Sequence, residues 1–438
     1  MPIISCEINK HFLPAHAEEL PSDPETAGAL FLSIDIEPEE GEATSDAVPN
    51  IVLLIDSSGS MMSENKIDVA KKAAKQFIDG LDNTDNISVI SFSEEVKAIC
   101  RGKKKLEDAK EKGVLDYLLD KDVVSESKDE MLEEIDNIEA RGGTALYEAL
   151  KHARDEILAS NISEDKRVDR MILLSDGRPT IGRSALDDFK KIAEDFSDEN
   201  ISVICGGIGG DYSEDILIAL AEKSRKGKWR HLKDNDDISA LFKTEVNRIK
   251  GTTMIKPDLI MKAVKGVEFG QIFQAEPEIS RCEDMRVEGG NYILPIGDVI
   301  AGEKQAYVAQ MYYPQRPVGE FRIAEVSLSD TQKKEIIVTY LKEPDKYEGE
   351  DNERPRHLFL TALASLEGRD VIDGDETKKD QVIKMATEII DESDDEDLIS
   401  RATQIRETIM DKDTVVLSEE EKKEKKGALS TTVILEDR

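Results

Sequence analysis

The sequence has few aromatic residues, few cysteines and few basic residues relative to acidic ones. Its 438 residues include 94 Asp or Glu and 59 Lys or Arg, which gives a formal net charge of −35. A surface this acidic repels phosphate backbones and anionic headgroups, because binding to either depends on Lys and Arg. Aromatic residues make up 5% of the chain, too few for platforms that stack single-stranded bases. We therefore expect no nucleic acid and no membrane among its partners.

The cysteines are scattered and form no C-x-x-C pair, which argues against a disulfide scaffold or a structural zinc site. They are Cys6, Cys100, Cys205 and Cys282. The first residues lack the basic start and apolar run of an export signal. Apolar stretches such as Ile51–Ile55 have the length of a core strand, far short of the roughly 18 residues that span a bilayer. These absences predict a soluble, cytoplasmic protein.

Residues 49–250 alternate short apolar strands with amphipathic helices. The expected strands are Ile51–Ile55, Ile87–Phe92, Met171–Leu174 and Ile201–Cys205. The expected helices include 67–81, 145–158, 187–196, 213–223 and 238–249. Apolar strands separated by helices of this length predict a parallel sheet that is covered on both faces, and hence an α/β fold.

The flanking sequences differ from this central part. Ala29–Ile36 alternates apolar and polar residues as a half-buried strand does. After Gly251 the chain has short strands separated by glycine-containing turns, a pattern typical of a β-sandwich. Helical spacing returns over residues 352–412. The last residues, 413–438, include the charged run Glu419–Lys426, and we expect them to form a flexible tail.

Oxygen-bearing side chains follow the strands of the central part. The first strand runs directly into Asp56-Ser57-Ser58-Gly59-Ser60. Two more loops, Arg141–Thr144 and Ser175–Gly177, are expected at the same edge, where the carboxyl ends of parallel strands form a ligand crevice. The side chains expected to converge are Asp56, Ser58, Ser60, Thr144 and Asp176.

This set contains three hydroxyls and two carboxylates, with no His or Cys. An all-oxygen set selects a hard cation, Mg²⁺ or Mn²⁺, over zinc or copper. If the hydroxyls bind the ion directly and the carboxylates act mainly through water, the ion stays poorly neutralised. It would then attract an Asp or Glu from a protein ligand. No catalytic constellation is evident, so we do not expect an enzyme.

The three segments, in this order and on these elements, resemble the metal-ion-dependent adhesion site of von Willebrand factor A (VWA) domains. The resemblance covers about residues 49–250. It implies a doubly wound, mostly parallel α/β domain that holds Mg²⁺ and binds protein without catalysis. It assigns the metal-ligand roles to the same five residues, Asp56, Ser58, Ser60, Thr144 and Asp176. One departure is the long charged stretch Arg101–Asp129.

The flanks extend the resemblance to cytosolic prokaryotic VWA proteins in which the domain is inserted into a β-sandwich. The implied organisation is a discontinuous β-sandwich of residues 1–48 plus 251–345 around a VWA domain of residues 49–250. A helical segment at 352–412 and the tail at 413–438 would follow.

Simpler interpretations compete at each motif. Asp56–Ser60 alone is typical of a turn that caps a helix. Gly206–Gly210 predicts a plain turn, because no Gly-Lys-Ser/Thr follows it. The acidic cluster Asp391–Asp397 predicts a solvated loop between helices, with a weak Ca²⁺ site as the alternative.

The leading hypothesis is therefore a Mg²⁺-dependent protein-binding module or scaffold. One alternative is an adaptor and substrate of a kinase and phosphatase system, suggested by Ser430–Thr432 near the end of the chain. Another is the substrate-recruiting subunit of a chelatase-like or chaperone-like ATPase. The chain has no G-x-x-x-x-G-K-[ST] motif, so that ATPase would be a separate partner.

Overall fold

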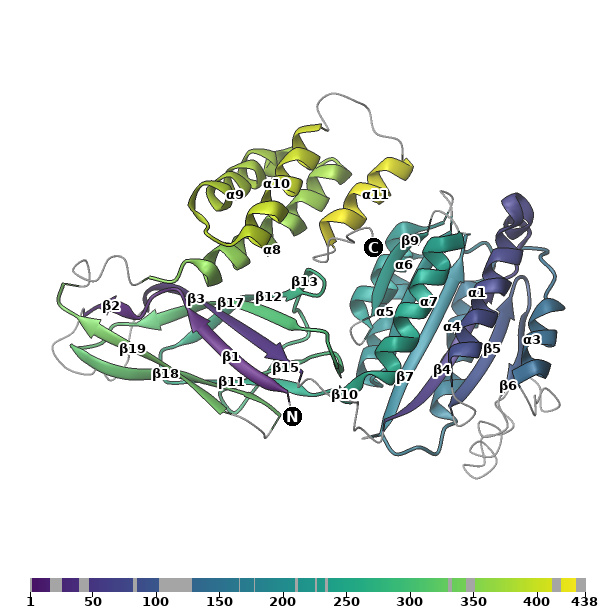
Figure 1. The fold of residues 1–438 in the computed structure, drawn as a ribbon, viewed down its shortest axis with the longest axis horizontal. Coiled ribbons are helices and arrows are strands. Elements are labelled where there is room, and N and C mark those ends of the chain that lie inside the picture. Colours follow the sequence, from purple (N-terminus) through teal and green to yellow (C-terminus); the bar gives the residue numbers. More distant parts are fainter. Residues whose placement is uncertain are drawn as a thin grey trace. The chain divides into compact units, whose positions relative to one another are not determined.

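The chain divides into two compact units in the computed structural model (Figure 1). One comprises residues 1–41 and 256–438, and the other comprises residues 42–255. The structure describes residues 2–15, 26–38, 47–81, 85–101, 128–164, 166–176, 178–208, 212–224, 227–232, 235–329, 333–343, 351–411 and 419–430. Within these residues, no helix combines the length and the apolar character needed to cross a membrane.

The discontinuous unit contains two β-sheets. The five-stranded sheet has the order β1-β3-β17-β12-β13 and the six-stranded sheet has the order β14-β15-β11-β18-β19-β2. Neighbours are antiparallel except for β19 and β2, which run parallel. The strands are β1 (Ile3–Ile8), β2 (Phe12–Pro14), β3 (Thr26–Glu37), β11 (Asp258–Ala263), β12 (Glu268–Glu276), β13 (Ser280–Arg281), β14 (Arg286–Glu288), β15 (Asn291–Pro295), β16 (Val299–Ile300), β17 (Gln305–Pro314), β18 (Gly319–Leu328) and β19 (Lys333–Leu341).

Aromatic side chains join the two sheets across a shared core. The rings of Tyr313 on β17 and Tyr340 on β19 lie 6.2 Å apart, edge to face. Phe269 on β12 and Tyr292 on β15 make a similar contact at 5.0 Å. Strands β3 and β17 pair although the whole second unit separates them in the sequence. The exact domain boundaries stay a prediction.

Helices α8–α11 belong to this same unit and cover the five-stranded sheet. They are α8 (Arg354–Asp373), the short η4 (Glu376–Lys378), α9 (Lys379–Glu392), α10 (Glu396–Asp411) and α11 (Glu419–Ser430). Phe359 of α8 contacts the rings of Phe31 on β3 and Phe273 on β12, each at 4.9 Å. The acidic cluster between α9 and α10 acts as a helix cap, because Asp395 Oδ1 accepts hydrogen bonds from the backbone N–H groups of Asp397 and Leu398.

Part of the expected flexible tail is helical. Residues 419–430 form α11, in which Leu429 is buried in the core of the helical layer and Lys426 pairs with Asp373 of α8. The prediction overlooked Leu429, whose burial against α8 outweighs the solvation of the preceding charged run. Thr431 and Thr432, part of the predicted phosphorylation segment, lie outside the described residues.

The second unit is built on one six-stranded sheet of order β6-β5-β4-β7-β8-β9. Its strands are β4 (Val48–Asp56), β5 (Asn86–Phe92), β6 (Val96–Arg101), β7 (Arg167–Ser175), β8 (Ser202–Ile208) and β9 (Lys228–Leu232). All neighbours are parallel except β5 and β6. The predicted α/β class and the mostly parallel sheet are confirmed.

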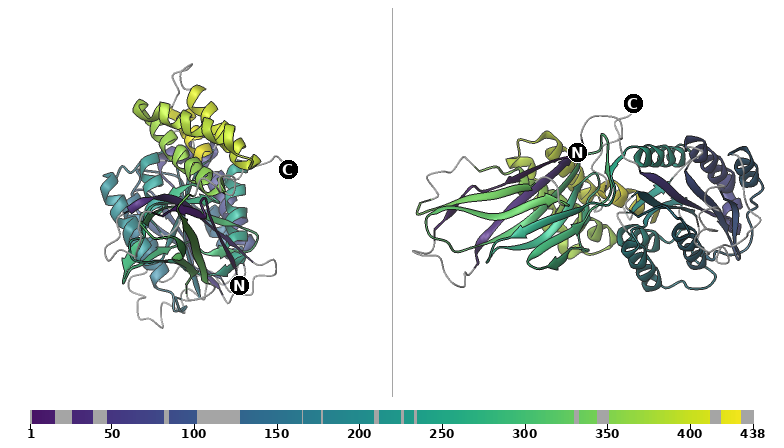
Figure 2. Two further views of the ribbon diagram at one scale, coloured as in Figure 1. Left: turned by 90° about the vertical axis from the view of Figure 1, so that its left-hand side faces the viewer. Right: turned by 90° about the horizontal axis from the view of Figure 1, so that it is seen from below.

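Helices cover both faces of this sheet, as Figure 2 shows. The helices are α1 (Lys66–Gly80), α3 (Lys128–Asp136), α4 (Leu146–Leu158), α5 (Leu186–Asp198), α6 (Glu214–Lys223) and α7 (Asn235–Lys250), with the short η1 (Gly59–Asn65) before α1 and strand β10 (Thr252–Met254) after α7. Alternate residues of β4 face opposite cores. Leu53 packs in the core with α1, α3 and α7, whereas Leu54 packs with α4, α5 and α6.

Strand β9 and helix α3 are among the elements of this unit that the sequence pattern did not predict. Strand β9 has the sequence Lys-Trp-Arg-His-Leu and lies at the edge of the sheet. Its polar residues lack the continuous apolar pattern by which the buried strands were predicted. Helix α3 begins inside the charged stretch Arg101–Asp129, of which residues 102–127 lie outside the described part.

A buried ion pair joins β6 to α4. The Arg101 guanidinium donates two hydrogen bonds to Glu156 Oε1, at 2.8 and 2.6 Å, and Ser88 Oγ donates to Glu156 Oε2 at 3.1 Å. Both charged side chains are at most 1% exposed. Removing one partner of such a pair leaves the other charge uncompensated in the core.

We expect Glu156→Gln to destabilise this unit by about 3 kcal/mol. Trp229, the one tryptophan of the chain, lies on β9 of the same unit, so its fluorescence during urea unfolding measures the effect. Glu148→Gln on the same helix removes an exposed carboxylate and is the matched control, with an expected change within about 0.5 kcal/mol. Equal midpoints for the two variants would contradict the prediction.

Candidate metal centre

Three loops meet beyond the carboxyl ends of β4 and β7. Gly59 N–H, after β4, donates to Gly142 O at 2.9 Å, and Thr180 N–H, after β7, donates to Thr144 O at 3.0 Å. The loop of residues 141–144 is thereby held between the other two. Gly142 has φ +71°, and an added Cβ would lie 2.7 Å from the side chain of Glu94, so this position favours glycine on both counts.

Four of the five predicted site residues form one chain of hydrogen bonds. Ser58 N–H donates to Asp56 Oδ1 at 2.8 Å. The hydroxyls of Ser58 and Ser60 lie 3.1 Å apart, and Ser60 Oγ donates to Asp176 Oδ1 at 2.8 Å. Asp56 and Asp176 are fully buried and Ser58 is nearly so, whereas Ser60 is exposed. The chain of bonds therefore runs between buried carboxylates and reaches the surface.

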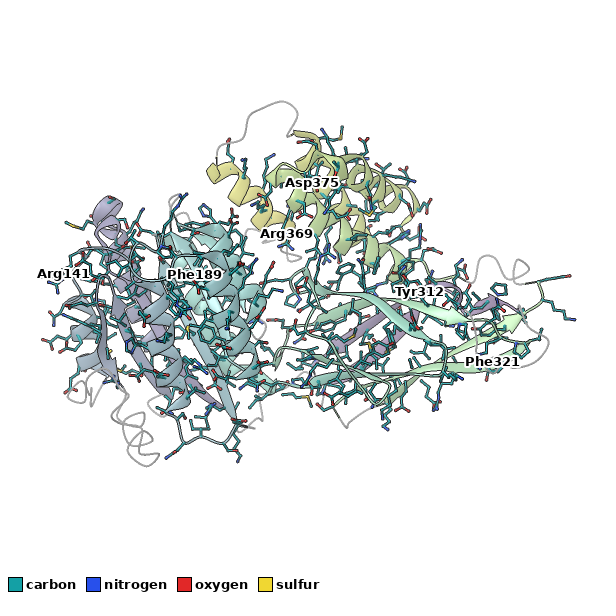
Figure 3. All side chains as sticks on the ribbon, turned by 180° about the vertical axis from the view of Figure 1, so that it is seen from behind. Arg141, Phe189, Tyr312, Phe321, Arg369 and Asp375 are labelled. Carbon is teal, nitrogen blue, oxygen red and sulfur yellow. The ribbon has the colours of Figure 1, made fainter. Side chains whose placement is uncertain are left out.

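Thr144, the fifth predicted residue, is buried in the middle loop. Its N–H donates to Thr180 Oγ1 at 2.8 Å, which anchors it to the segment that follows Asp176. The neighbouring Arg141 N–H donates to Ser57 O at 2.7 Å. Arg141 itself is exposed and lies at this end of the sheet (Figure 3). The five predicted residues are thus gathered at one edge.

Asp56 is electrostatically the most unusual of them. Burial raises the pKa of its carboxyl group to about 6, although hydrogen bonds from Ser175 and Ser58 lower it, and the charge of Asp176 raises it further. Two carboxylates in the same buried site repel each other, so the ionised pair needs nearby positive charge or hydrogen-bond donors.

Two residues outside the predicted set supply these donors and this positive charge. Ser175 Oγ donates to Asp56 Oδ2 at 2.5 Å, and Lys66 Nζ donates to Asp176 Oδ2 at 2.9 Å. Ser175 directly precedes Asp176 as the last residue of β7, which is a usable sequence signal. Lys66 gave no such signal, because its proximity depends on the path of η1.

The donor set fits a hard divalent cation. It offers carboxylate and hydroxyl oxygens with two buried negative charges, which is the chemistry that Mg²⁺ and Mn²⁺ select. Among the described residues there is no cluster of three or more His, Cys, Asp or Glu suited to a metal. Any cation here would therefore depend on serine and threonine hydroxyls for part of its coordination.

Comparison with known proteins identifies the domain. Residues 49–227 match the family described as von Willebrand factor type A domain. The chain contains a VWA domain. A solved structure described as von Willebrand factor type A from Catenulispora acidiphila is similar over 99% of this chain and 97% of its own, with TM-score 0.73 and 18% identity. The ArnB paralog VWA2 from Sulfolobus acidocaldarius is similar over 99% of both chains, with TM-score 0.56 and 17% identity. These likenesses extend the shared fold beyond the VWA domain to the additional β-sheets.

Sequence relatives match over shorter regions. An uncharacterized protein of Synechocystis is 24% identical over 284 residues, which is 64% of this chain and 60% of that protein. Inter-alpha-trypsin inhibitor heavy chain H2 of Mus musculus is 29% identical over 211 residues, 47% of this chain and 20% of its own length. The match thus spans less than two thirds of each relative. VWA domains generally mediate metal-dependent protein binding.

We expect Ser175→Ala to weaken Mn²⁺ binding about tenfold, because it removes the donor that orients the Asp56 carboxylate and stabilises its ionised form. Titration of the full chain with Mn²⁺, followed by the electron paramagnetic resonance signal of the free ion, measures this affinity. Ser57→Ala is the matched control, since Ser57 Oγ donates to Phe92 O. A loss of affinity in the control as large as in Ser175→Ala would contradict the assigned role of Ser175.

Proposed function

We propose that the VWA domain binds a protein partner through a divalent cation, Mg²⁺ or Mn²⁺. Asp56, Ser58, Ser60, Thr144 and Asp176 hold the ion, and an Asp or Glu of the partner completes its coordination. The domain acts as a binding module or scaffold without catalysing a reaction. The support is the continuous chain of hydrogen bonds from Asp56 through Ser58 and Ser60 to Asp176.

The chemistry of this chain favours an external carboxylate. Neutral hydroxyls leave most of the cation charge uncompensated, and the two carboxylates are already engaged with Ser175 and Lys66. Exposed Ser60 gives the partner access to the ion. A partner carboxylate would therefore gain a charge-assisted contact that no single neutral ligand offers.

A protein ligand fits the surroundings better than a small anion. Met62 lies in η1, two residues after Ser60, and its side chain is 68% exposed, so it offers apolar surface beside the site. An apolar contact beside the ion would add binding energy and would select a partner with an apolar residue near its ligating acid. The net charge of −35 favours a partner with basic residues around that acid.

The test is capture of the partner by the immobilised full chain in Mg²⁺ and in chelator. We expect the captured protein to depend on Mg²⁺ and to be lost with Ser58→Ala, because the variant lacks a hydroxyl ligand. Ser63→Ala changes an exposed hydroxyl in η1 and should capture the same protein as the unaltered chain. Equal capture by Ser58→Ala in chelator would overturn the proposal.

Met62→Ser should weaken binding of the captured partner several-fold and leave Mn²⁺ affinity unchanged, because Met62 offers apolar surface and no metal ligand. Surface plasmon resonance with the purified partner gives the first quantity and a Mn²⁺ titration gives the second. Met410→Ser, which alters a 53% exposed methionine of the other unit, is the matched control. Identical partner affinity for the two variants would exclude Met62 from the binding surface.

A further inference from the structure

A lysine ammonium already contacts the buried Asp176 carboxylate. Lys66 Nζ lies 2.9 Å from Asp176 Oδ2, while the other carboxylate oxygen, Oδ1, accepts the hydrogen bond of Ser60. The Lys66 side chain is 12% exposed and that of Asp176 is 0% exposed, so water screens this pair little. Both oxygens of Asp176 are thus engaged by groups of the same chain.

The backbone directs Lys66 to this position. Helix η1 spans Gly59–Asn65, and Asn65 adopts a left-handed conformation with φ 57° and ψ 27°. Asparagine tolerates this conformation better than most residues. Lys66 follows as the first residue of α1, so the change of direction at Asn65 places its side chain beside the carboxyl end of β7 instead of in solvent.

The charges of the site can be summed. Asp56 and Asp176 contribute two negative charges and Lys66 contributes one positive charge, leaving a net charge of −1 among these three side chains. A divalent cation would convert this to +1, which one partner carboxylate would neutralise. Without Lys66 the same cation would neutralise the site by itself and leave no net charge to attract a carboxylate.

We propose that Lys66 is an internal counter-cation of the metal centre. Its ammonium weakens binding of the divalent ion and leaves the occupied site with a net positive charge, which the carboxylate of the partner neutralises. This inference rests on the proposed function and adds a residue that tunes it. Lys66 also stabilises the metal-free site, because it compensates Asp176 when no ion is bound. Metal affinity and metal-free stability should therefore change in opposite directions when the ammonium is removed.

The test uses the full chain and Mn²⁺ alone, with no partner. We expect Lys66→Gln to bind Mn²⁺ roughly tenfold more tightly than the unaltered chain, since a like charge beside the ion is removed. Without metal, the melting temperature of this variant, followed by Trp229 fluorescence, should be lower than that of the unaltered chain. Saturating Mn²⁺ should raise the melting temperature of the variant by more than it raises that of the unaltered chain. Lys66→Arg keeps the charge and should resemble the unaltered chain in both measurements.

Lys72→Gln is the matched control, because Lys72 is exposed on the same helix and its loss changes the net charge equally. If Lys66→Gln folds poorly without metal, Lys66→Met is refolded in Mn²⁺ and its Mn²⁺ affinity is compared with that of Lys66→Arg. This comparison still sets a neutral side chain against a charged one. Unchanged or weaker Mn²⁺ affinity in the neutral variants overturns the inference and leaves the proposed function intact. If neither the unaltered chain nor any Lys66 variant binds Mn²⁺, the inference and the proposed function are both overturned.

Discussion

Two carboxylates with no exposure to solvent impose the main constraint on the VWA domain. Asp56 ends β4 and Asp176 directly follows the neighbouring parallel strand β7, and both side chains are fully buried. Burying charge is costly unless each oxygen has a donor. The hydroxyls of Ser58, Ser60 and Ser175 and the ammonium of Lys66 can be understood as compensation for that cost.

The fold makes this compensation possible by fixing where the strands end. Alternate residues of β4 bury their apolar side chains in two different cores, so a shift of one residue would move Asp56 off the edge and disrupt both faces. The loop of residues 141–144 then joins the two other loops through backbone hydrogen bonds. The position of the site is therefore a consequence of core packing, whereas its chemistry depends on a few loop residues.

Most helices of the central part and its apolar strands could be predicted because their apolar residues repeat with a clear period, whereas β9 and α3 lack that pattern. Four of the five site residues could be proposed because they lie at or just after the ends of parallel strands that share an edge, and Thr144 because its loop precedes a helix at that edge. Lys66 could not, since its side chain reaches Asp176 through the left-handed turn at Asn65, which periodicity does not encode. Helix α11 was overlooked because its buried Leu429 comes only after a long charged run.

The pairing of β3 with β17 has a consequence for biosynthesis. Ile36 pairs with Gln305, so β3 has no neighbour on that side until the entire VWA domain has left the ribosome. During that interval one edge of β3, with its apolar Leu30, Leu32 and Ile34, stays open to association with other chains. The VWA domain, whose six-stranded sheet pairs only segments within residues 48–232, can fold first and so lower the entropic cost of bringing β3 and β17 together.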